Sequence, residues 1–555
     1  MHKGSHNLEL KRSLFPLLKK EKRSIIAISS CLLMVMVISA FLPLVSAKII
    51  DEGFINYNLH HIIKYSALLM LMTVCIYALY YICEDIRLKA NKRISFSLKE
   101  KASKKLLSIE IDYYSQKNAA EIFQKIDNDI KTIAGIFSST SILSLMQIVL
   151  SIGYIVVLSI INWKLTLLVV SFIPVKFFLT LIISKKNVRV SSDLKNAETA
   201  FSAWLGDMIN GMREVRIFNL AAWFSSNFNK RQDAVLQSEY QQGKLSNINQ
   251  TLQITLVNTI VTVLYIVSGF IVNDGSLSVG EVIAVQTYSL TTLDFVSNFL
   301  DLIYGFSSLI PSLSRFNAFI NYPSESNGGT EKITSLEISF IHVCFGYKNS
   351  EEVVHDFNAT IKPGKKYAII GANGSGKTTL MNLLLRFYSP TDGAIKIGDK
   401  NIREIPLEQY RNQFSVVSQD CFLMNDTIIN NVVLNQDYDI NVLSDVFETV
   451  QLTDFVSKKG TDYIIGNNGS MLSGGQKQKI ALARAIISDR PIVILDEATS
   501  NIDKGWSEII QTLIKKQFKD KTVIIITHKK EVLEYVDEQF LLSRTTGVRN
   551  ENCNN

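Results

Sequence analysis

Six long apolar runs occupy the first part of the chain, and they restrict what it can fold into more than any other feature. A helix needs about 20 apolar residues to cross the hydrocarbon core of a bilayer, which is about 30 Å thick. Each run reaches that length, although the last two contain several polar residues and are assigned by length and pairing. The six predicted membrane helices are Ile25–Ala47, Ile62–Cys83, Phe137–Ile161, Leu165–Ile183, Thr251–Val272 and Val279–Phe306.

Composition and charge agree with a chain that lies partly in lipid. The 555 residues are 47% hydrophobic and carry a net charge of +7. The basic residues lie mostly beside the apolar runs rather than in one block, so we expect the bilayer as a partner and no nucleic acid. The six cysteines lack CxxC spacing, which argues against a zinc site or a disulfide framework. The first run is too long and starts too late to be a cleaved signal peptide.

The positive charges also predict the topology, because cytoplasmic flanks carry the excess of Lys and Arg. They cluster before the first run, after the second and after the fourth. We therefore place both termini in the cytoplasm and the protein in the cytoplasmic membrane. The outer loops are then short: Lys48–His61, Asn162–Lys164 and Asn273–Ser278. The two longer cytoplasmic connections show helical spacing of apolar residues, which indicates membrane helices prolonged into the cytoplasm.

The second part of the chain has a different pattern. Residues 321–332 (NYPSESNGGTEK) are rich in Pro, Gly and Ser and form a predicted linker. Beyond it, β-rich runs such as Tyr367–Ile370, Ile492–Leu495 and Val523–Ile526 alternate with amphipathic stretches, as in α/β domains with a parallel sheet. We predict a multi-domain protein: a cytoplasmic segment (1–24), an all-α six-helix transmembrane domain (25–320), the linker (321–332), an α/β domain (333–541) and a polar tail without a final strand (542–555).

The first motif of the α/β domain that indicates a chemical function is a phosphate-binding loop. The sequence GANGSGKTT follows the strand-like run KYAII and precedes a helix-like run. In that context the glycines let backbone N–H groups face a triphosphate, the lysine adds charge, and the next hydroxyl binds Mg²⁺. A plain Gly-rich connection would not require the Lys-Thr pair. The predicted cofactors are ATP and Mg²⁺, and the predicted ligands are Gly371, Asn373, Gly374, Ser375, Gly376, Lys377, Thr378 and Thr379.

Two carboxylates end a buried-strand pattern further along, in Ile492–Glu497. We predict that Asp496 holds Mg²⁺ through water and that Glu497 polarises the attacking water as general base. Acidic residues also favour helix starts, so the pair alone is a weak signal. Its position after a phosphate loop strengthens the assignment.

Between these motifs lies Leu472–Gln476, LSGGQ, which on its own could be a helix cap. With the phosphate loop before it and Asp-Glu after it, the chain resembles the exporters of the ATP-binding cassette (ABC) family over nearly its whole length. The resemblance implies a half-transporter that hydrolyses ATP to drive export by alternating access. It also implies that the signature of one subunit completes the ATP site of the other, through Ser473, Gly474, Gly475 and Gln476.

The same resemblance implies roles for four single residues, Tyr347, Gln419, Asp503 and His528. Tyr347 is similar to the aromatic residue that stacks on adenine. Gln419 is similar to the residue that contacts the metal and links the γ-phosphate to the membrane domain. Asp503 resembles an acid that communicates across the dimer, and His528 resembles the switch histidine. Without the surrounding motifs, each would be read as an ordinary core or surface residue.

The chain departs from the family pattern at a few positions. Asn467 and Asn468 stand where many exporters have an acidic-basic pair, and Lys479 replaces an arginine after the signature. None of these changes removes a group that hydrolysis needs. Asp112–Tyr114 and Arg213–Phe218 fall where the family places the short helices that couple the two domains.

The partner and the cargo are predicted from the same resemblance. Because the chain keeps both halves of the ATP site, we expect a homodimer, with a heterodimer as the alternative. The first expectation for the cargo is a small antibiotic-type peptide. A multidrug exporter, a lipid exporter and a non-transporting ATP-dependent regulator are the alternatives, and fold alone does not decide between them.

A polar stripe marks the expected cargo path. Its residues recur at intervals of three and four, which places them on one face of a helix. Charges inside a bilayer favour a wet cavity or a partner helix, although hydroxyls and amides can also tie helices together. The sixth run contributes Thr287, Thr291, Asp294, Asn298 and Asp301, and the fifth contributes Thr255 and Asn258.

Overall fold

The computed structural model describes residues 16, 19–115, 119–347, 351–372, 374–496, 506–527, 530–542 and 549–551. The chain divides into two compact units. The membrane unit comprises residues 1–107 and 117–322, and the cassette unit comprises residues 108–116 and 323–555. The predicted domain boundaries stay predictions.

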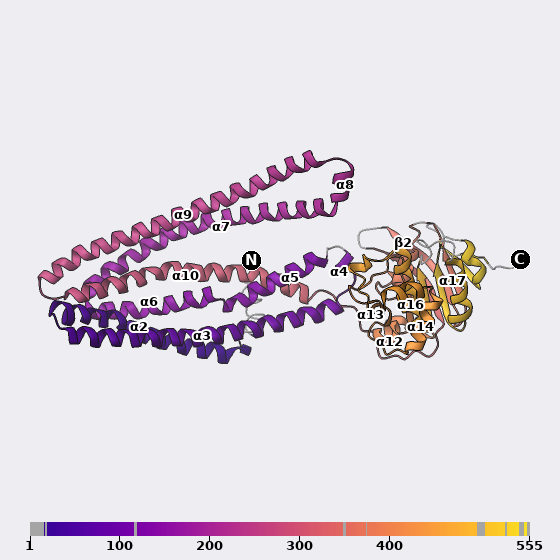
Figure 1. The fold of residues 1–555 in the computed structure, drawn as a ribbon, viewed down its shortest axis with the longest axis horizontal. Coiled ribbons are helices and arrows are strands. Elements are labelled where there is room, and N and C mark those ends of the chain that lie inside the picture. Colours follow the sequence, from indigo (N-terminus) through magenta and orange to yellow (C-terminus); the bar gives the residue numbers. More distant parts are fainter. Residues whose placement is uncertain are drawn as a thin grey trace. The chain divides into compact units, whose positions relative to one another are not determined.

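The membrane unit is built from long helices (Figure 1). In chain order they are α2 (Lys22–Lys48), the π-helix η1 (Ile49–Ile55), α3 (Leu59–Ser108), α5 (Ala119–Ala134), the 3-10 turn η2 (Gly135–Phe137), α6 (Ser139–Ile161), α7 (Trp163–Asn210), α8 (Met212–Ile217), α9 (Ala221–Asn273) and α10 (Val279–Ile320). Of the described residues, five segments are long and apolar enough to span a membrane, and they cover the first five predicted runs. The sixth run forms α10, which is 42 residues long and packs against α6, α2 and α7 in the same bundle.

The lengths of three helices agree with membrane helices that continue beyond the bilayer, while the side on which they project stays a prediction. Helices α3, α7 and α9 have 50, 48 and 53 residues. At a rise of 1.5 Å per residue, each is about 75 Å long, more than twice the bilayer core. Helices α7 and α9 pack along each other and form a hairpin that α8 closes. Toward α8, this hairpin diverges from α6 and α10 (Figure 1).

The first outer loop differs from its prediction, because helix continues through much of Lys48–His61. Asp51, within η1, accepts hydrogen bonds from the Gly280 N–H at 2.8 Å and the Ser278 hydroxyl at 2.5 Å, and so caps α10. A Cβ atom on Gly280 would lie 2.3 Å from the Ala47 carbonyl oxygen, so only glycine permits this approach. The contact comes from residues far apart in sequence, which is why the local pattern indicated a loop.

An apolar core holds α2, α6, α7, α9 and α10 together. The rings of Tyr154 and Tyr288 meet edge to face with centroids 4.9 Å apart, and the Tyr288 hydroxyl donates to the Ala40 carbonyl of α2. The remaining fully buried residues of this core include Leu158, Leu165, Val169, Ile260, Leu264 and Leu293.

The cassette unit contains two sheets, as predicted for an α/β domain. The antiparallel sheet has the order β2-β1-β4-β5, and the second sheet has the order β10-β9-β3-β8-β7-β6. In the second sheet β9, β3, β8, β7 and β6 are parallel. The strands are β1 (Ile338–Gly346), β2 (Glu352–Ile361), β3 (Lys366–Ile370), β4 (Asp392–Ile397), β5 (Lys400–Asn401), β6 (Phe414–Val417), β7 (Ile492–Asp496), β8 (Thr522–Ile526), β9 (Glu538–Leu541) and β10 (Arg549–Glu551).

The predicted strands at Tyr367, Ile492 and Val523 are confirmed as β3, β7 and β8. The expectation that the polar tail lacks a strand is wrong, because β10 pairs antiparallel with β9, with Asn550 opposite Phe540. A three-residue polar strand has no apolar alternation, so only its pairing partner reveals it.

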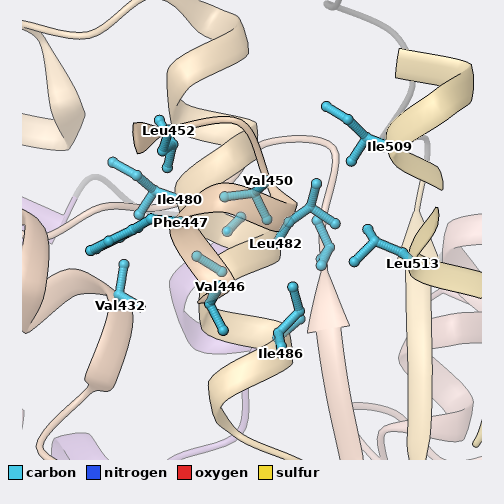
Figure 2. Close-up of a cluster of buried hydrophobic side chains, with 14 of the residues drawn as sticks. Val432, Val446, Phe447, Val450, Leu452, Ile480, Leu482, Ile486, Ile509 and Leu513 are labelled. Carbon is cyan, nitrogen blue, oxygen red and sulfur yellow. The ribbon is translucent and has the colours of Figure 1, made fainter. Parts of the chain in front are cut away.

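Short helices surround the sheets: α4 (Asp112–Ser115), α11 (Lys377–Leu384), α12 (Leu407–Arg411), α13 (Ile428–Val433), α14 (Ile440–Thr449), α15 (Thr453–Lys459), α16 (Gly474–Ile487) and α17 (Trp506–Thr512). Figure 2 shows the core in which α16 packs against α13, α14 and the region of α17. Within it, Val446 and Phe447 of α14 and Ile480, Leu482 and Ile486 of α16 are buried. This packing fixes α16 and therefore the position of the signature at its start.

Candidate functional site

The phosphate loop lies between β3 and α11, in the predicted context. Gly376, the residue before α11, has a φ of 96°, and a Cβ atom there would lie 2.9 Å from the Val353 carbonyl oxygen. Only glycine suits this left-handed, crowded position. Lys377 is 6% exposed, and its ammonium donates to the carbonyls of Gly371 at 2.9 Å and Ala372 at 3.0 Å. The charge is therefore held inside the loop.

A buried hydroxyl lies in the same loop. Ser375 is 3% exposed, and its Oγ has no hydrogen-bond partner among the described residues. Leaving a buried polar group unpaired costs about 1–3 kcal/mol, so native proteins rarely keep one without a ligand or a function. An unpaired hydroxyl beside a lysine and a helix start suits the oxygens of a phosphate.

The sheet order brings the other predicted ATP-site residues to one edge. The parallel strands β3, β8, β7 and β6 are neighbours, so their carboxyl ends lie along the same side. The phosphate loop follows β3, Asp496 ends β7, and Gln419 comes two residues after β6. Asp496 is 4% exposed, whereas Gln419 and Thr378 are exposed. Oxygen groups of this kind suit Mg²⁺.

Four predicted residues lie outside the described part of the chain. Glu497 follows Asp496 directly and His528 follows the buried Thr527, but neither is described, and Asn373 and Asp503 are not described either. Their roles stay predictions.

Tyr347 belongs to an aromatic cluster beside α11. Its ring meets those of Phe345 and Tyr388 edge to face, with centroid distances of 5.1 Å and 5.2 Å. Its hydroxyl lies 3.1 Å from Thr379 Oγ1. A cavity of about 370 Å³ borders this cluster, within the size range of ligand pockets. The predicted contact of Tyr347 with adenine stays a prediction.

The segment 108–116 lines the same cavity with Glu110 and Asp112. It is joined to the cassette by backbone hydrogen bonds from Glu110 N–H to the Pro323 carbonyl at 3.3 Å and from Glu325 N–H to the Ser108 carbonyl at 2.8 Å. The predicted coupling segment at Asp112 is therefore helical, as α4, and part of the cassette unit. The second one is helical too, as α8 in the membrane unit.

The signature is both a helix cap and an exposed site. Ser473 Oγ accepts the Gln476 N–H at 3.2 Å, and the Gln476 side chain accepts the Ser473 N–H at 2.9 Å, which makes a capping box at the start of α16. Ser473 and Gly474 are exposed, whereas Gly475 and Gln476 are partly buried. The helix start therefore faces solvent in a single cassette and can receive a group from outside it.

Asn468 has a structural role in place of the family's charged pair. It takes a φ of 48°, its Oδ1 accepts the Leu423 N–H at 3.3 Å, and its carbonyl accepts the Lys477 ammonium at 2.7 Å. These bonds tie the segment before α16 to the loop after β6, which carries Gln419. In that loop burial raises the pKa of the Cys421 thiol, so this thiol stays protonated at neutral pH.

Most residues of the predicted cargo path are exposed in the single chain. Thr255, Asn258, Thr287 and Asp294 are exposed, and Thr291 and Asn298 are partly buried. The Asp301 side chain lies outside the described part of the structure. Sequence reasoning missed Lys176, whose Nζ lies 3.3 Å from Asp294 Oδ1. The signal was a single lysine inside the fourth apolar run.

Comparisons with known proteins cover both units. The family model of the ABC transporter transmembrane region matches residues 25–294, and that of the ABC transporter matches residues 354–500. An "ATP-dependent lipid A-core flippase" of Haemophilus ducreyi is 26% identical over 95% of this chain and 92% of its own length. A flippase of the same name from Legionella pneumophila is 29% identical over 79% of this chain and 75% of its own length.

A solved structure has the same fold. The ATP-bound structure of a bacterial Atm1-family ABC exporter matches with a TM-score of 0.79 and 20% identity, over 95% of this chain and 94% of that one. The two family matches, the phosphate loop and the exposed signature agree with this fold. The chain is therefore a multi-pass membrane protein that couples ATP hydrolysis to transport, and it belongs to the ABC transporter family, with one transmembrane region, one ATPase region and the fold of an ABC exporter.

Proposed function

We propose that this exporter moves a lipid-type amphiphile across the membrane as a homodimer with two composite ATP sites. The composite site is inferred from the difference in exposure between two motifs of one cassette, the phosphate loop and the signature. Lys377 is buried in its loop, whereas Ser473 is exposed and, among the described residues, its side chain bonds within its own helical turn. The phosphates held by one copy would meet the α16 start of the other.

The hairpin of α7 and α9 supports a second copy. Its cytoplasmic end exposes large apolar side chains, with exposed fractions of 60% for Ile217, 68% for Phe218 and 48% for Trp223. Lipid does not cover residues beyond the membrane, so large exposed apolar side chains there suit a protein partner. Because this chain carries both halves of the ATP site, a second copy of itself would cover the apolar side chains and also complete the ATP sites. A heterodimer is the alternative.

At each site the loop N–H groups and Lys377 would hold the triphosphate, and Tyr347 would stack on adenine. Thr378, Gln419 and Asp496 would hold Mg²⁺, which when bound neutralises charge on the phosphates. Glu497 would polarise the attacking water, and His528 and Asp503 would sense the γ-phosphate and the second copy. Ser473 and Gly475 of the second copy would close the site.

ATP binding would close the two cassettes and turn the cargo cavity outward, and hydrolysis would reset it. In this arrangement both termini are cytoplasmic. The polar stripes of α9 and α10 would line the cavity, because most of their side chains are exposed in a single chain.

For the cargo, the curated relatives favour the lipid alternative over the peptide. Those named above are lipid flippases, and none of them supports the expected antibiotic-type peptide. The shared plan alone does not set the substrate, so the lipid assignment rests on this likeness.

The test is lipid transport in proteoliposomes. We expect fluorescent phospholipid to change leaflets with ATP in the parent protein and not in Glu497→Gln, which should still bind ATP. Phosphate release measured in parallel checks the general base. ATP hydrolysis that moves no lipid, but is stimulated by small cationic peptides, would return the cargo assignment to the peptide.

A further inference from the structure

One buried charge has no role in the chemistry of the ATP site. Lys176 of α7 is 2% exposed, and its Nζ lies 3.3 Å from Asp294 Oδ1 of α10. Lysine is almost never fully buried unless it is paired, and a charge inside a membrane helix marks a functional position by default. The Asp294 side chain, in contrast, is 61% exposed.

The two residues lie at the same depth. Lys176 is about 20 Å along α7 from Trp163, and Asp294 is about 22 Å along α10 from Val279, at 1.5 Å per residue. Both helices start at the outer side in the predicted topology. The pair therefore lies inside the hydrocarbon core, beyond its middle and toward the cytoplasm.

The exposure of the Asp294 carboxylate indicates that the ion pair does more than hold α7 and α10 together. A tie is strongest when both charges are buried and fully bonded, yet here only the lysine is buried. The structure describes no partner for Asp294 Oδ2, and Thr287, Thr291 and Asn298 lie on the same face of α10. Lys176 therefore positions the exposed Asp294 carboxylate so that its Oδ2 can accept a hydrogen bond from a ligand.

The net charge of the pair restricts what binds there. An ammonium group that reaches Asp294 also comes close to the ammonium of Lys176, which repels it. A headgroup that carries its own anion next to the ammonium offsets this repulsion. A choline headgroup has no N–H or O–H donor for the free oxygen. A glycerol headgroup can donate through its hydroxyls, but it brings no positive charge and its phosphate is repelled by the Asp294 carboxylate.

We propose that Lys176 and Asp294 form a headgroup site for an amphiphile with a primary ammonium beside an anionic group, such as a zwitterionic phospholipid. The inference rests on the proposed lipid function and adds the class of headgroup. Asp294 accepts from the ammonium, and Lys176 positions Asp294 and sets the charge preference.

The test compares three tail-labelled lipids in proteoliposomes. Phosphatidylethanolamine has the ammonium and the anion, phosphatidylcholine has no N–H donor, and phosphatidylglycerol has no cation. A hydrogen bond between charged groups contributes enough for about a tenfold preference. We expect the parent to move phosphatidylethanolamine about tenfold faster than either of the other lipids.

The key variant is Lys176→Met with Asp294→Asn, which removes both charges and leaves no buried charge unpaired. We expect it to move the three lipids at similar rates. Matched controls are Lys164→Met at the exposed start of α7 and Asp274→Asn after α9, which should keep the preference. The single Lys176→Met variant should gain transport of a labelled long-chain alkylamine, because the repelling charge is gone.

The outcomes separate the two proposals. If the double variant keeps the tenfold preference, the pair is only a structural tie and the headgroup site is wrong. If the parent prefers phosphatidylglycerol, lipid transport stands and the headgroup class is wrong. If the parent hydrolyses ATP and moves none of the lipids, the proposed cargo itself is wrong.

Discussion

At the residue scale, Lys377 and Ser375 are expected to set the affinity of the phosphate loop for its ligand. The loop carbonyls already hold the Lys377 ammonium in place, so little entropy is lost when phosphates bind. We expect Lys377→Ala to weaken ATP binding about 100-fold, from the loss of charged hydrogen bonds. Calorimetric titration measures this directly.

The matched control is Lys516→Ala, an exposed lysine of the same unit. It should bind ATP as the parent does. Equal affinity of Lys377→Ala and the parent would show that the loop holds phosphate through its backbone alone.

The sequence predicts residues of the phosphate loop well, because their chemistry depends on neighbours in the chain. The local pattern reveals the strands β3 and β7, and in the structure Lys377 begins the helix after β3 and Asp496 is the last residue of β7. Lys176 could not be paired in advance. Its partner Asp294 is 118 positions away, and only the packing of α7 on α10 brings the two together.

At the element scale, Ser473 is expected to serve two purposes that substitution can separate. Aspartate caps helices as well as serine does, so Ser473→Asp should keep α16 and the thermal stability of the cassette. It would also place a negative charge where the phosphate of the second copy arrives. We expect ATPase activity to fall at least about tenfold while the unfolding temperature changes little.

A cap exchange elsewhere controls for helix effects. Asp439 caps α14 by accepting the Asn441 N–H at 2.8 Å, and Asp439→Ser should leave both activity and stability unchanged. Full ATPase activity in Ser473→Asp would mean that the signature serine caps a helix and does nothing more.

The start of α2 is tied to α3 by a pH-sensitive pair. Arg93 donates to both oxygens of the Glu21 carboxylate, at 2.9 Å and 2.7 Å, and this lowers the pKa of Glu21 below its ordinary value. A depressed folded-state pKa means that the pair stabilises the fold above the ordinary carboxyl pKa of about 4.3. That stability is lost as the pH falls through the lower, folded value.

We therefore expect Glu21→Gln to lower the unfolding temperature at pH 7 and to lower it less at pH 3, measured in detergent by thermal scans. Glu100→Gln is the control, because its pair with Lys104 is exposed and contributes little. An effect of Glu21→Gln that is equal at both pH values would contradict the role of its charge.

Elements were predictable to the extent that their pattern is local. The long helices and the parallel strands follow from apolar runs and their period. The π-helix η1 depends on Asp51 reaching the start of α10, and β10 depends on pairing with β9. Both are set by partners distant in the chain, which no local pattern reports.

At the scale of the whole molecule, the proposed topology predicts where tags are accessible. A single-cysteine tag at Gly275, between α9 and α10, should react with an impermeant reagent in intact cells. A tag at Lys186, in the cytoplasmic part of α7, should react only after permeabilisation. The reverse pattern would overturn the orientation of the six helices.

The central claim is that two copies build each ATP site together, and mixed dimers test it most directly. Differently tagged copies are co-expressed, mixed dimers are isolated by tandem purification, and phosphate release is measured. The first dimer pairs a Lys377→Ala copy with a Ser473→Asp copy. The second pairs a copy that carries both changes with an unaltered copy.

If sites are shared, the first dimer keeps one intact site, because the unaltered Lys377 of one copy meets the unaltered Ser473 of the other. The second dimer has none. We predict clear ATPase activity in the first dimer and only background in the second. Activity in the second dimer and background in the first would show that each ATP site lies within one copy, and would contradict the account.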